Sequence, residues 1–218
     1  MNRALVLLFI LVTAILSSCD KSTEGSLIIR GNISDSRNGF AIGNAEVIIK
    51  QQLLEGGSFN SNFVTAIQGN SASSGAYELE FERENSAAYR LELEKDGYFS
   101  KRYDINPDDI RPGVPYTKNG TLVSRATLHL RLFNDMPFNN EDRIRFRHLN
   151  ANFDDCPCCD NDFIVLEGND ADSIISCDLH GDFQIKYVWE VTKNDTTIIY
   201  VDSLFCPAFM ETELEINY

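Results

Sequence analysis

The chain has 218 residues and a formal net charge of −14, from 19 Lys and Arg against 33 Asp and Glu. Hydrophobic residues make up 43% of it, which is too many for a disordered polyanion. The acidity argues against nucleic acid as a partner, because phosphate contact needs a basic face. A chain of this length forms one large domain or two small ones.

The first segment has the pattern of an export signal. Arg3 precedes a continuous apolar run from Ala4 to Leu16, which is shorter than the roughly 20 residues that span a bilayer. A basic start, a short apolar run and then small residues are typical of a secretory signal. The run ends in Leu16-Ser17-Ser18-Cys19, which resembles a bacterial lipobox. The resemblance implies that residues 1–18 are cleaved and that Cys19 carries lipid, followed by a polar tether over residues 19–25.

Lipidation of Cys19 predicts a place in the cell envelope. Several acyl chains, palmitate among them, bury enough methylene groups for stable anchoring, whereas one chain is marginal. We therefore expect an outer-membrane lipoprotein that meets the membrane through its anchor. An envelope protein or a glycan would be its second partner. The alternative is an ordinary signal peptide that happens to contain a cysteine.

From Ser26 onward the apolar residues recur with a period of two, which is typical of half-buried strands. The clearest case is Tyr77, Leu79 and Phe81, which alternate with three glutamates. In chain order we expect strands near residues 27–33, 45–50, 63–68, 76–82, 89–94 and 127–133. Turn residues separate them, and the pattern predicts an antiparallel sandwich over residues 26–134. Residues 106–120 are expected to form a loop, with Leu128, Leu130 and Leu132 completing this first sandwich.

Several of these segments resemble a known family. Residues 27–33 followed by 38–47 look like the opening of a carboxypeptidase-regulatory-like domain, which is a transthyretin-like β-sandwich. Ser74-Gly75-Ala76-Tyr77 matches its middle signature, and Lys95-Asp96-Gly97-Tyr98 matches its later one. The resemblance implies an accessory module without catalytic residues of its own.

The match has limits. It covers roughly residues 26–133, Ala41 stands where the family usually has Pro, and the insert at 51–62 is longer than usual. The end of the chain, with Asp202 to Pro207 and then Glu215 to Tyr218, looks similar to lipoproteins of Bacteroidetes-type bacteria. That second resemblance implies no activity.

The acidity is concentrated after residue 134. Residues 20–134 hold 13 basic and 15 acidic side chains, whereas residues 135–218 hold 5 basic and 18 acidic ones. Alternating patterns predict strands near residues 143–147, 162–166, 183–191, 196–201 and 212–218, with a hairpin turn at Lys193-Asn194-Asp195. We expect a second, small β-sandwich-like domain over residues 135–218. The fold class is therefore all-β, with a transthyretin/Ig-like sandwich first and this acidic domain second.

Five of the six cysteines lie in the acidic part. The disulfide candidates are Cys156, Cys158, Cys159, Cys177 and Cys206. Export makes disulfides the default state of these thiols. An odd number leaves at least one cysteine unpaired, and the sequence does not determine which cysteines pair. Mostly free thiols are a further alternative.

A metal site is the competing interpretation of the same residues. Zinc could take thiolates and imidazoles from a set comprising Cys156, Cys159, Cys177, Cys206, His148 and His180. Calcium could take oxygens from Asp160-Asn161-Asp162 and from residues 169–172, although neither matches a complete EF-hand loop. An acidic, solvated surface explains the same carboxylates without a metal. We expect no cofactor.

Arg143, Arg145 and Arg147 occupy one face of an expected strand. They could bind an anionic ligand, or they could pair with acids on adjacent strands, which is the interpretation we favour.

Two functions follow from these patterns. The first is a lipid-anchored, non-catalytic binding or assembly module, and on this interpretation the protein is not an enzyme. The second is a zinc- or calcium-binding protein, or a metal-dependent hydrolase, that uses the C-terminal Cys, His and Asp residues. The histidines stand apart from one another in the sequence, and no motif joins them to a nucleophile.

Overall fold

The computed structural model describes residues 25–55, 58–59, 61–151, 153, 156 and 162–218. The expected signal segment and the lipid-carrying Cys19 lie outside the described residues. Cys158, Cys159 and the calcium candidates Asp160 and Asn161 lie outside them as well.

The described chain is almost entirely β-structure, as the alternating pattern predicts. The strands are β1 (Ser26–Asp35), β2 (Glu46–Glu55), β3 (Ser58–Phe59), β4 (Val64–Asn70), β5 (Ala76–Glu82), β6 (Ser86–Glu94), β7 (Tyr98–Phe99), β8 (Lys101–Ile105), β9 (Tyr116–Thr117), β10 (Gly120–Phe133), β11 (Arg143–His148), β12 (Ile164–Glu167), β13 (Asp172–His180), β14 (Phe183–Lys193), β15 (Thr196–Cys206) and β16 (Glu211–Asn217). A 3-10 turn, η1 (Pro107–Asp109), interrupts the expected loop at 106–120, which also contains β9. No helix in the described part is long and apolar enough to cross a membrane.

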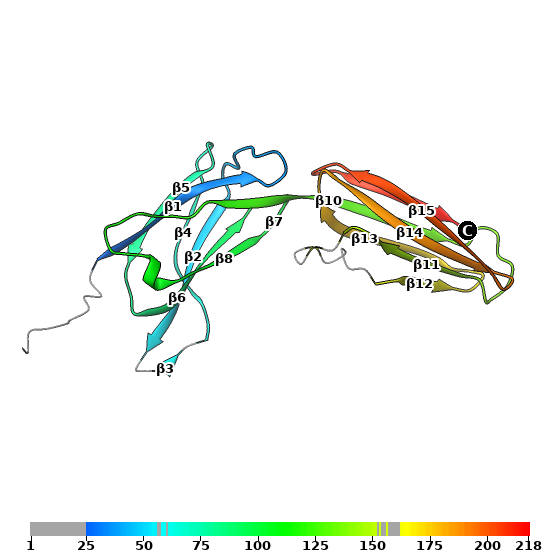
Figure 1. Ribbon diagram of the computed structural model, residues 1–218, viewed down its shortest axis with the longest axis horizontal. Coiled ribbons are helices and arrows are strands. Elements are labelled where there is room, and N and C mark those ends of the chain that lie inside the picture. The colour runs from blue at the N-terminus through cyan, green and yellow to red at the C-terminus, as the bar shows by residue number, and fades with distance from the viewer. Residues whose placement is uncertain (1–24, 56–57, 60, 152, 154–155, 157–161) are drawn as a thin grey trace, which may run out of the picture.

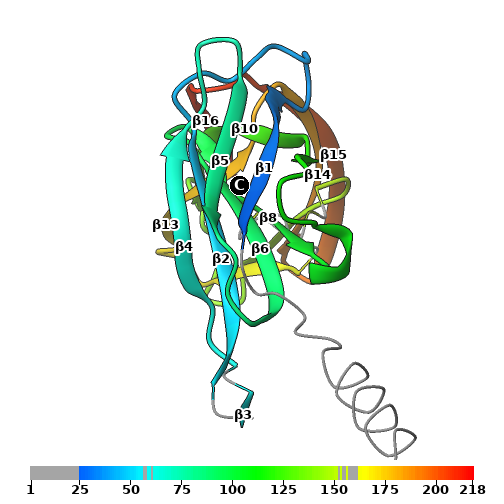
Figure 2. The same cartoon turned by 90° about the vertical axis from the view of Figure 1, so that its left-hand side faces the viewer.

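The molecule is elongated and consists of two lobes placed end to end (Figures 1 and 2). We call the body around the buried residues of β1, β2, β5 and β6 the first lobe, and the body around those of β11, β13, β14 and the second half of β10 the second lobe. β1 begins at the end of the first lobe that points away from the second lobe (Figure 1). The chain therefore enters at one tip of the molecule.

The first lobe packs two sheets against each other. β1 pairs antiparallel with β5 and parallel with β9 and with the start of β10. Facing it, β2 lies between β4 and β6, and β8 pairs with β6. Leu27, Ile29, Val47, Leu91 and Leu93 are almost completely buried between the sheets. Burial of such side chains contributes about 1.5–3 kcal/mol each, which makes this alternation the main source of stability.

The alternation predicted for β5 is confirmed. Tyr77 and Phe81 are buried, Leu79 packs against them, and the three glutamates of the strand are exposed. On β6 the same pattern holds at Tyr89, Leu91 and Leu93 but fails at Glu92, which is only 4% exposed. The Glu92 carboxylate lies 2.6 Å from Lys50 Nζ and 3.3 Å from Arg102 Nε. Glu92 tolerates burial because two cations from the neighbouring strands compensate its charge.

β10 belongs to both lobes. Its first residues pair with β1 and β7, and its stretch from Thr127 to Phe133 pairs with β13 and β16. The expectation that Leu128, Leu130 and Leu132 complete the first sandwich is wrong, since all three are buried in the core of the second lobe. The strand is 14 residues long. It is too long to end within one sandwich, and the alternating pattern itself does not tell which core its later residues enter.

The second lobe is also a sandwich. One layer is β13-β10-β16, and the other is the four-stranded sheet β12-β11-β14-β15. Ile144, Phe146, Ile185 and Leu179 lie in the core between the layers. The hairpin predicted at Lys193-Asn194-Asp195 is confirmed: β14 and β15 pair over their whole length, and Asn194 and Asp195 both have positive φ angles of 46° and 59°. Asn and Asp tolerate this left-handed conformation, which two-residue hairpin turns require.

Candidate functional site

A network of direct contacts joins the two lobes. Gly181 N–H donates to the carbonyl of Ser124 at 2.7 Å, and Arg125 N–H donates to the carbonyl of Gly97 at 2.7 Å. The Tyr98 ring packs edge-on against Phe209 with 5.2 Å between the centroids. Burial raises the pKa of Tyr98 above its ordinary value, and the Asp35 carboxylate raises it further. These contacts make the junction a packed interface in addition to the shared strand.

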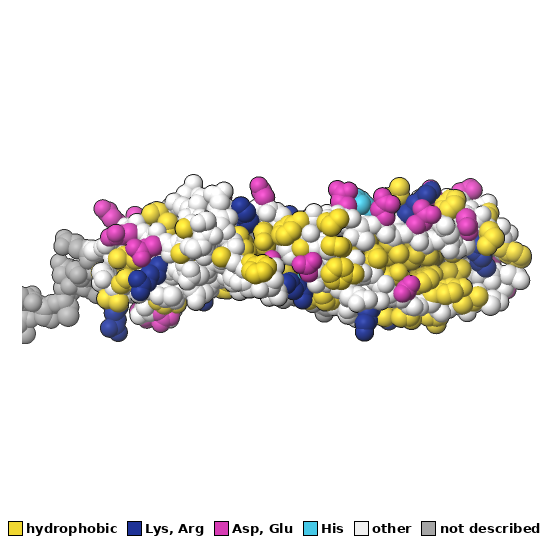
Figure 3. All heavy atoms as spheres, turned by 90° about the horizontal axis from the view of Figure 1, so that it is seen from above, with side chains coloured by type: hydrophobic (Ala, Val, Ile, Leu, Met, Phe, Trp, Pro, Cys, Tyr) yellow, Lys and Arg dark blue, Asp and Glu magenta, His cyan; other side chains and the backbone are white. Residues whose placement is uncertain are grey.

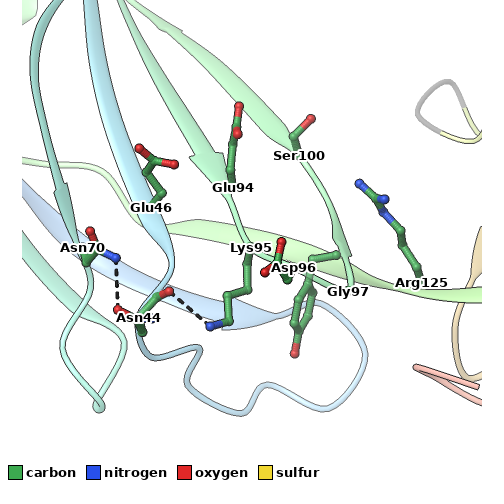
Figure 4. A pocket seen from close by; sticks show the side chains of 10 residues that line it. Asn44, Glu46, Asn70, Glu94, Lys95, Asp96, Gly97, Ser100 and Arg125 are labelled. Atoms are coloured by element: carbon green, nitrogen blue, oxygen red, sulfur yellow. Dashed lines mark hydrogen bonds between the residues drawn. The ribbon is translucent and has the colours of Figure 1, made fainter.

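A polar hollow of about 430 Å³ opens beside this junction (Figure 4). Its lining comes from the ends of β2, β4 and β6, from the residues around β7 and from β10. The lining residues are Asn44, Glu46, Asn70, Glu94, Lys95, Asp96, Gly97, Tyr98, Ser100 and Arg125.

Two hydrogen bonds to Asn44 order the edge of the hollow. Asn70 Nδ2 donates to the Asn44 side-chain oxygen at 3.0 Å, and Lys95 Nζ donates to its backbone carbonyl at 3.2 Å (Figure 4). Glu46 and Glu94 lie directly opposite each other across the β2–β6 pair. Like charges in this position repel. The lining contains neither histidine nor cysteine, and its charged and amide side chains make the hollow polar.

The cysteines that the structure describes all belong to the second lobe. Cys156 and Cys177 are in the disulfide-bonded form, whereas Cys206 is a free thiol that is fully buried. Burial raises the pKa of the Cys206 thiol, and a hydrogen bond with Thr212 lowers it in part. Which cysteines pair stays a prediction, because Cys158 and Cys159 lie outside the described residues.

The two buried histidines of the second lobe pack against aromatic rings. His148 lies edge-on to Phe146 with 5.3 Å between the centroids. The His180 ring is stacked on Phe153 at 3.9 Å and lies 5.3 Å from Phe99. Within the part of the chain that the structure describes, no three His, Cys, Asp or Glu residues are grouped so that they could hold a metal ion.

Among the described residues, the structure therefore does not group the predicted metal ligands into a site. Cys156, Cys177, Cys206, His148 and His180 are described, and they form no such group. Cys159 lies outside the described residues. The same finding covers the described calcium candidates, Asp162 and residues 169–172.

A buried polar network closes the far end of the second lobe. The Asp142 side chain is fully buried and accepts hydrogen bonds from Phe138 N–H at 2.8 Å and from Asn134 Nδ2 at 3.0 Å. Lys193 Nζ donates to Asn134 Oδ1 at 2.9 Å and lies 3.8 Å from the Asp142 carboxylate. Burial alone would raise the pKa of Asp142, but these bonds and the Lys193 charge outweigh it and hold the pKa below its ordinary value. The network fixes the loop between β10 and β11.

The outer face of the sheet β12-β11-β14-β15 carries the three arginines. Arg143 lies 3.9 Å from Glu167 and Arg145 lies 3.0 Å from Glu190, so the predicted pairing with adjacent strands is confirmed for these two. The guanidinium groups of Arg145 and Arg147 both lie over the Phe163 ring, at 3.9 and 4.6 Å from its centroid. Arg147 has no acidic partner among the described residues.

The strand registers define the rest of this surface, which we call the basic face. Neighbouring rows across the sheet are Glu167-Arg143-Thr192-Thr197, then Val165-Arg145-Glu190-Ile199, then Arg147-Val188-Val201, and then Lys186-Ser203 and Gln184-Phe205. Ile199, Val201 and Phe205 are 62%, 66% and 52% exposed. The basic face therefore combines cationic and apolar side chains.

The outer face of the other layer, β13-β10-β16, is acidic, and we call it the acidic face. It presents Asp172, Asp178, Glu211, Glu213 and Glu215 around Arg125, His129 and Arg131. Arg131 lies 3.0 Å from Asp172 and 3.2 Å from Glu215, and its two hydrogen bonds to Asp172 lower the pKa of that carboxyl. Ile174 is 69% exposed on the same face.

Sequence reasoning did not identify the polar network around Asp142 or the contrast between the two faces. Asn134 and Lys193 are 59 positions apart in the sequence, and no local motif predicts their contact. The arginine stripe was visible as an alternation. The arginine stripe lies on the opposite side of the second lobe from the β16 glutamates. This placement depends on which strands share a layer, which the alternation does not reveal.

No family model matches this chain, and no curated protein matches it. Among solved structures, the chain is similar to the Bacillus anthracis TIE protein, with a TM-score of 0.37 and 10% identity over 88% of this chain and 34% of that one. It is also similar to 3-chlorocatechol 1,2-dioxygenase from Rhodococcus opacus 1CP, with a TM-score of 0.35 and 12% identity over 48% of this chain and 61% of that one.

A third solved structure is the shaft pilin spaA from Lactobacillus rhamnosus GG, with a TM-score of 0.33 and 6% identity over 89% of this chain and 97% of the pilin. The chain spans about a third of the first of these proteins and less than two thirds of the second. Similarity of this extent carries no argument about function.

Proposed function

We propose that the protein is a lipid-anchored, non-catalytic module of the cell envelope that holds its acidic second lobe at a distance from the membrane. Its role would be assembly or binding, with an envelope protein or a glycan as the partner. The lipobox-like Leu16-Ser17-Ser18-Cys19 supports the anchor and an outer-membrane location. The architecture of the described residues supports the role of a spacer.

The shared strand β10 is the observation that carries this proposal. At about 3.3 Å per residue, its 14 residues extend over roughly 46 Å and enter both hydrophobic cores. The junction adds the Tyr98–Phe209 contact and the Gly181–Ser124 hydrogen bond. A flexible linker has no such contacts. The two lobes therefore form one stiff body.

The entry point of the chain supports the orientation. β1 begins at the tip of the first lobe (Figure 1), and Cys19 precedes Ser26 by only a short polar segment. A lipid on Cys19 would therefore hold the first lobe at the membrane and make the second lobe the distal part. We propose the first and second lobes as the two domains of the mature chain, close to the predicted ranges 26–134 and 135–218.

Disulfides in the second lobe are part of the same proposal. An exported protein meets an oxidising compartment, where thiols such as Cys156 and Cys177 persist as disulfides. Cys158 and Cys159 are the remaining candidates for pairing, and the buried Cys206 would be the unpaired fifth cysteine.

The anchor is tested by replacing Cys19. We expect Cys19→Ala to abolish incorporation of an alkyne-labelled palmitate analogue and to release the protein from the membrane fraction. The matched control is Ser17→Ala, which keeps a small residue in the lipobox and should remain lipidated. A Cys19→Ala chain that still carries label would contradict the anchor.

The stiffness is tested by small-angle X-ray scattering of the Cys19→Ala chain. A two-lobed rod with one fixed length is expected. In Gly97→Ala, the new Cβ would lie 2.9 Å from the Phe209 ring of the second lobe, at a backbone φ of +79° that disfavours a side chain. The Tyr98–Phe209 contact should therefore loosen, and the distribution of lengths should broaden. Gly69→Ala is the control, because its Cβ meets only the flexible end of Leu79. A broad distribution already in the parent chain would contradict a stiff spacer.

A further inference from the structure

The two outer faces of the second lobe carry opposite charges. Among the described residues, the basic face holds Arg143, Arg145, Arg147 and Lys186 against Glu167 and Glu190, a net charge of +2. The acidic face holds five carboxylates against Arg125 and Arg131, a net charge of −3. In the space-filling view, acidic side chains gather along one side of this lobe, and hydrophobic side chains cover its middle (Figure 3). The second lobe therefore has one positively charged face and one negatively charged face, although its total charge is strongly negative.

Each face also retains a charged group that forms no ion pair within the described chain. Arg147 forms no ion pair there, and its Nε is buried without a hydrogen bond. Glu213, at the centre of β16, is exposed and forms no ion pair there. Arg145 and Glu215, the neighbours of these residues, are already paired within the chain.

Exposed apolar side chains accompany the unpaired charges on both faces. Ile199 and Val201 flank the arginine rows on the basic face, and Ile174 lies next to Arg131 on the acidic face. Apolar area that adjoins complementary charge is the composition of an interaction surface.

We propose that these two faces bind each other in neighbouring copies of this chain, with the basic face of one second lobe against the acidic face of the next. The proposal rests on the proposed function, because it names the assembly partner of the anchored module as a second copy. Since the two contact surfaces differ, the contact is heterologous and generates a row or a ring of copies. Copies related by translation keep the same orientation, so all of them can stand on one membrane.

The size of the faces determines how strong the contact is. Strands lie about 4.8 Å apart and rows about 6.8 Å apart, and the last two rows cross only two strands, so the face measures roughly 500 Å². A stable complex buries about 800 Å² on each partner. The contact is therefore weak in free solution and becomes substantial when lipid anchors concentrate the copies on one surface.

The first experiment measures self-association of the Cys19→Ala chain by sedimentation velocity at low and high salt, and of the lipidated protein in vesicles by carbodiimide cross-linking. We expect weak association at about 50 mM salt that falls at least tenfold at 500 mM. In vesicles, we expect cross-links from Lys186 to the β16 glutamates of another copy. Arg147→Glu should abolish both signals. Lys101→Glu makes the same charge change on an exposed position of the first lobe and should leave both unchanged.

A mixing experiment tests the heterologous geometry. Arg147→Glu spoils the basic face and Glu213→Arg spoils the acidic face, so neither variant should associate alone. When the two variants are mixed, the intact acidic face of Arg147→Glu should bind the intact basic face of Glu213→Arg in a 1:1 complex. This complex should bind further copies only if the two altered faces, which carry exchanged charges, also bind each other.

Other results would overturn the inference. Two results would show that the two faces do not bind each other. One is association of the Arg147→Glu chain alone, and the other is association of the Glu213→Arg chain alone, which has no intact acidic face. Binding of anionic vesicles by the arginines, without cross-links between copies, would assign the basic face to a membrane surface. If no association is seen while Cys19 still incorporates palmitate and the scattering still fits a rod, this inference fails and the proposed function stands.

Discussion

The first and second lobes share strand β10 but expose different charge to solvent. Residues 20–134 carry 13 basic and 15 acidic side chains, whereas residues 135–218 carry 5 and 18. Both lobes bury a comparable core of alternating aliphatic and aromatic side chains. The first lobe neutralises its buried Glu92 with two cations. The second lobe satisfies its buried Asp142 mainly with hydrogen bonds from the adjacent loop and from Asn134.

This difference teaches that net charge is a poor description of a surface. The region with the greatest excess of acid also contains the Arg143, Arg145 and Arg147 row. The layers of the sandwich separate the two signs, because side chains on opposite faces of a sandwich never meet. Whether the two lobes also unfold separately is a question of how β10 couples their cores.

The largest effect is expected from truncating the shared strand within each core. Leu128 is 1% exposed in the second lobe, and Leu122 is fully buried in the first. Each substitution by alanine should lower the free energy of unfolding by about 2–5 kcal/mol. The single tryptophan, Trp189, packs against the second core and reports on that lobe in urea unfolding followed by fluorescence.

The two variants form a matched pair. If β10 couples the lobes, both Leu128→Ala and Leu122→Ala will lower the urea concentration at which the Trp189 fluorescence changes. If only Leu128→Ala lowers it, the lobes unfold independently and the shared strand does not transmit stability.

The next effect concerns disulfides and should be confined to one lobe. Residues 26–134 contain no cysteine, whereas residues 135–218 contain five. Reduction should therefore lower the stability reported by Trp189 by about 2–4 kcal/mol for each bridge lost. Hydrogen exchange of β2 and β6 in the first lobe should not change. Unreduced protein, once denatured, should show one reactive thiol; five would contradict the disulfides.

Glu92→Ala should have a smaller effect in the first lobe, of about 1–3 kcal/mol, because Lys50 would lose its partner. Glu94→Ala, on the same strand but exposed and opposite Glu46, is the control and should change stability little. Thermal unfolding followed by circular dichroism measures both. Equal losses in the two variants would mean that the Glu92 ion pairs contribute nothing specific.

The sequence predicts the fold class and most strands because a strand records its buried face locally, as Tyr77 and Phe81 do on β5. It also predicts the hairpin turn at Asn194-Asp195, which two residue types determine. It does not predict which core receives Leu128, since the pattern of β10 is uniform from end to end.

The candidate sites were harder to predict for the same reason. Glu92 looks like its exposed neighbours in the sequence and differs only through Lys50 and Arg102, which are on other strands. By residue type the cysteines and histidines form one ligand set. Among the described ones, Cys177 and His180 share β13, whereas His148 ends β11 and Cys206 ends β15 in the other layer. Contacts between distant segments depend on layer order, and an alternating pattern contains no information on that order.

The smallest expected effect is a dependence of the second lobe on acid pH. Hydrogen bonds and Lys193 hold the pKa of Asp142 below its ordinary value of 3.8. The stability that this shift contributes is fully present above the unfolded pKa and is lost as the pH falls through the folded one. Fluorescence of Trp189 in urea at a series of pH values from about 6 down to 2 measures it.

Asp142→Asn isolates this contribution. The amide still accepts a hydrogen bond from the Phe138 N–H but cannot titrate. The free energy of unfolding should therefore fall less steeply between about pH 5 and pH 3. Asp135→Asn, which removes an exposed carboxylate in the same loop, is the control and should keep the full slope. An unchanged slope in Asp142→Asn would mean that Asp172, which Arg131 holds at a lowered pKa, accounts for the acid sensitivity. In that case the acidic face, and not the buried network around Asp142, would make the second lobe less stable than the first at low pH.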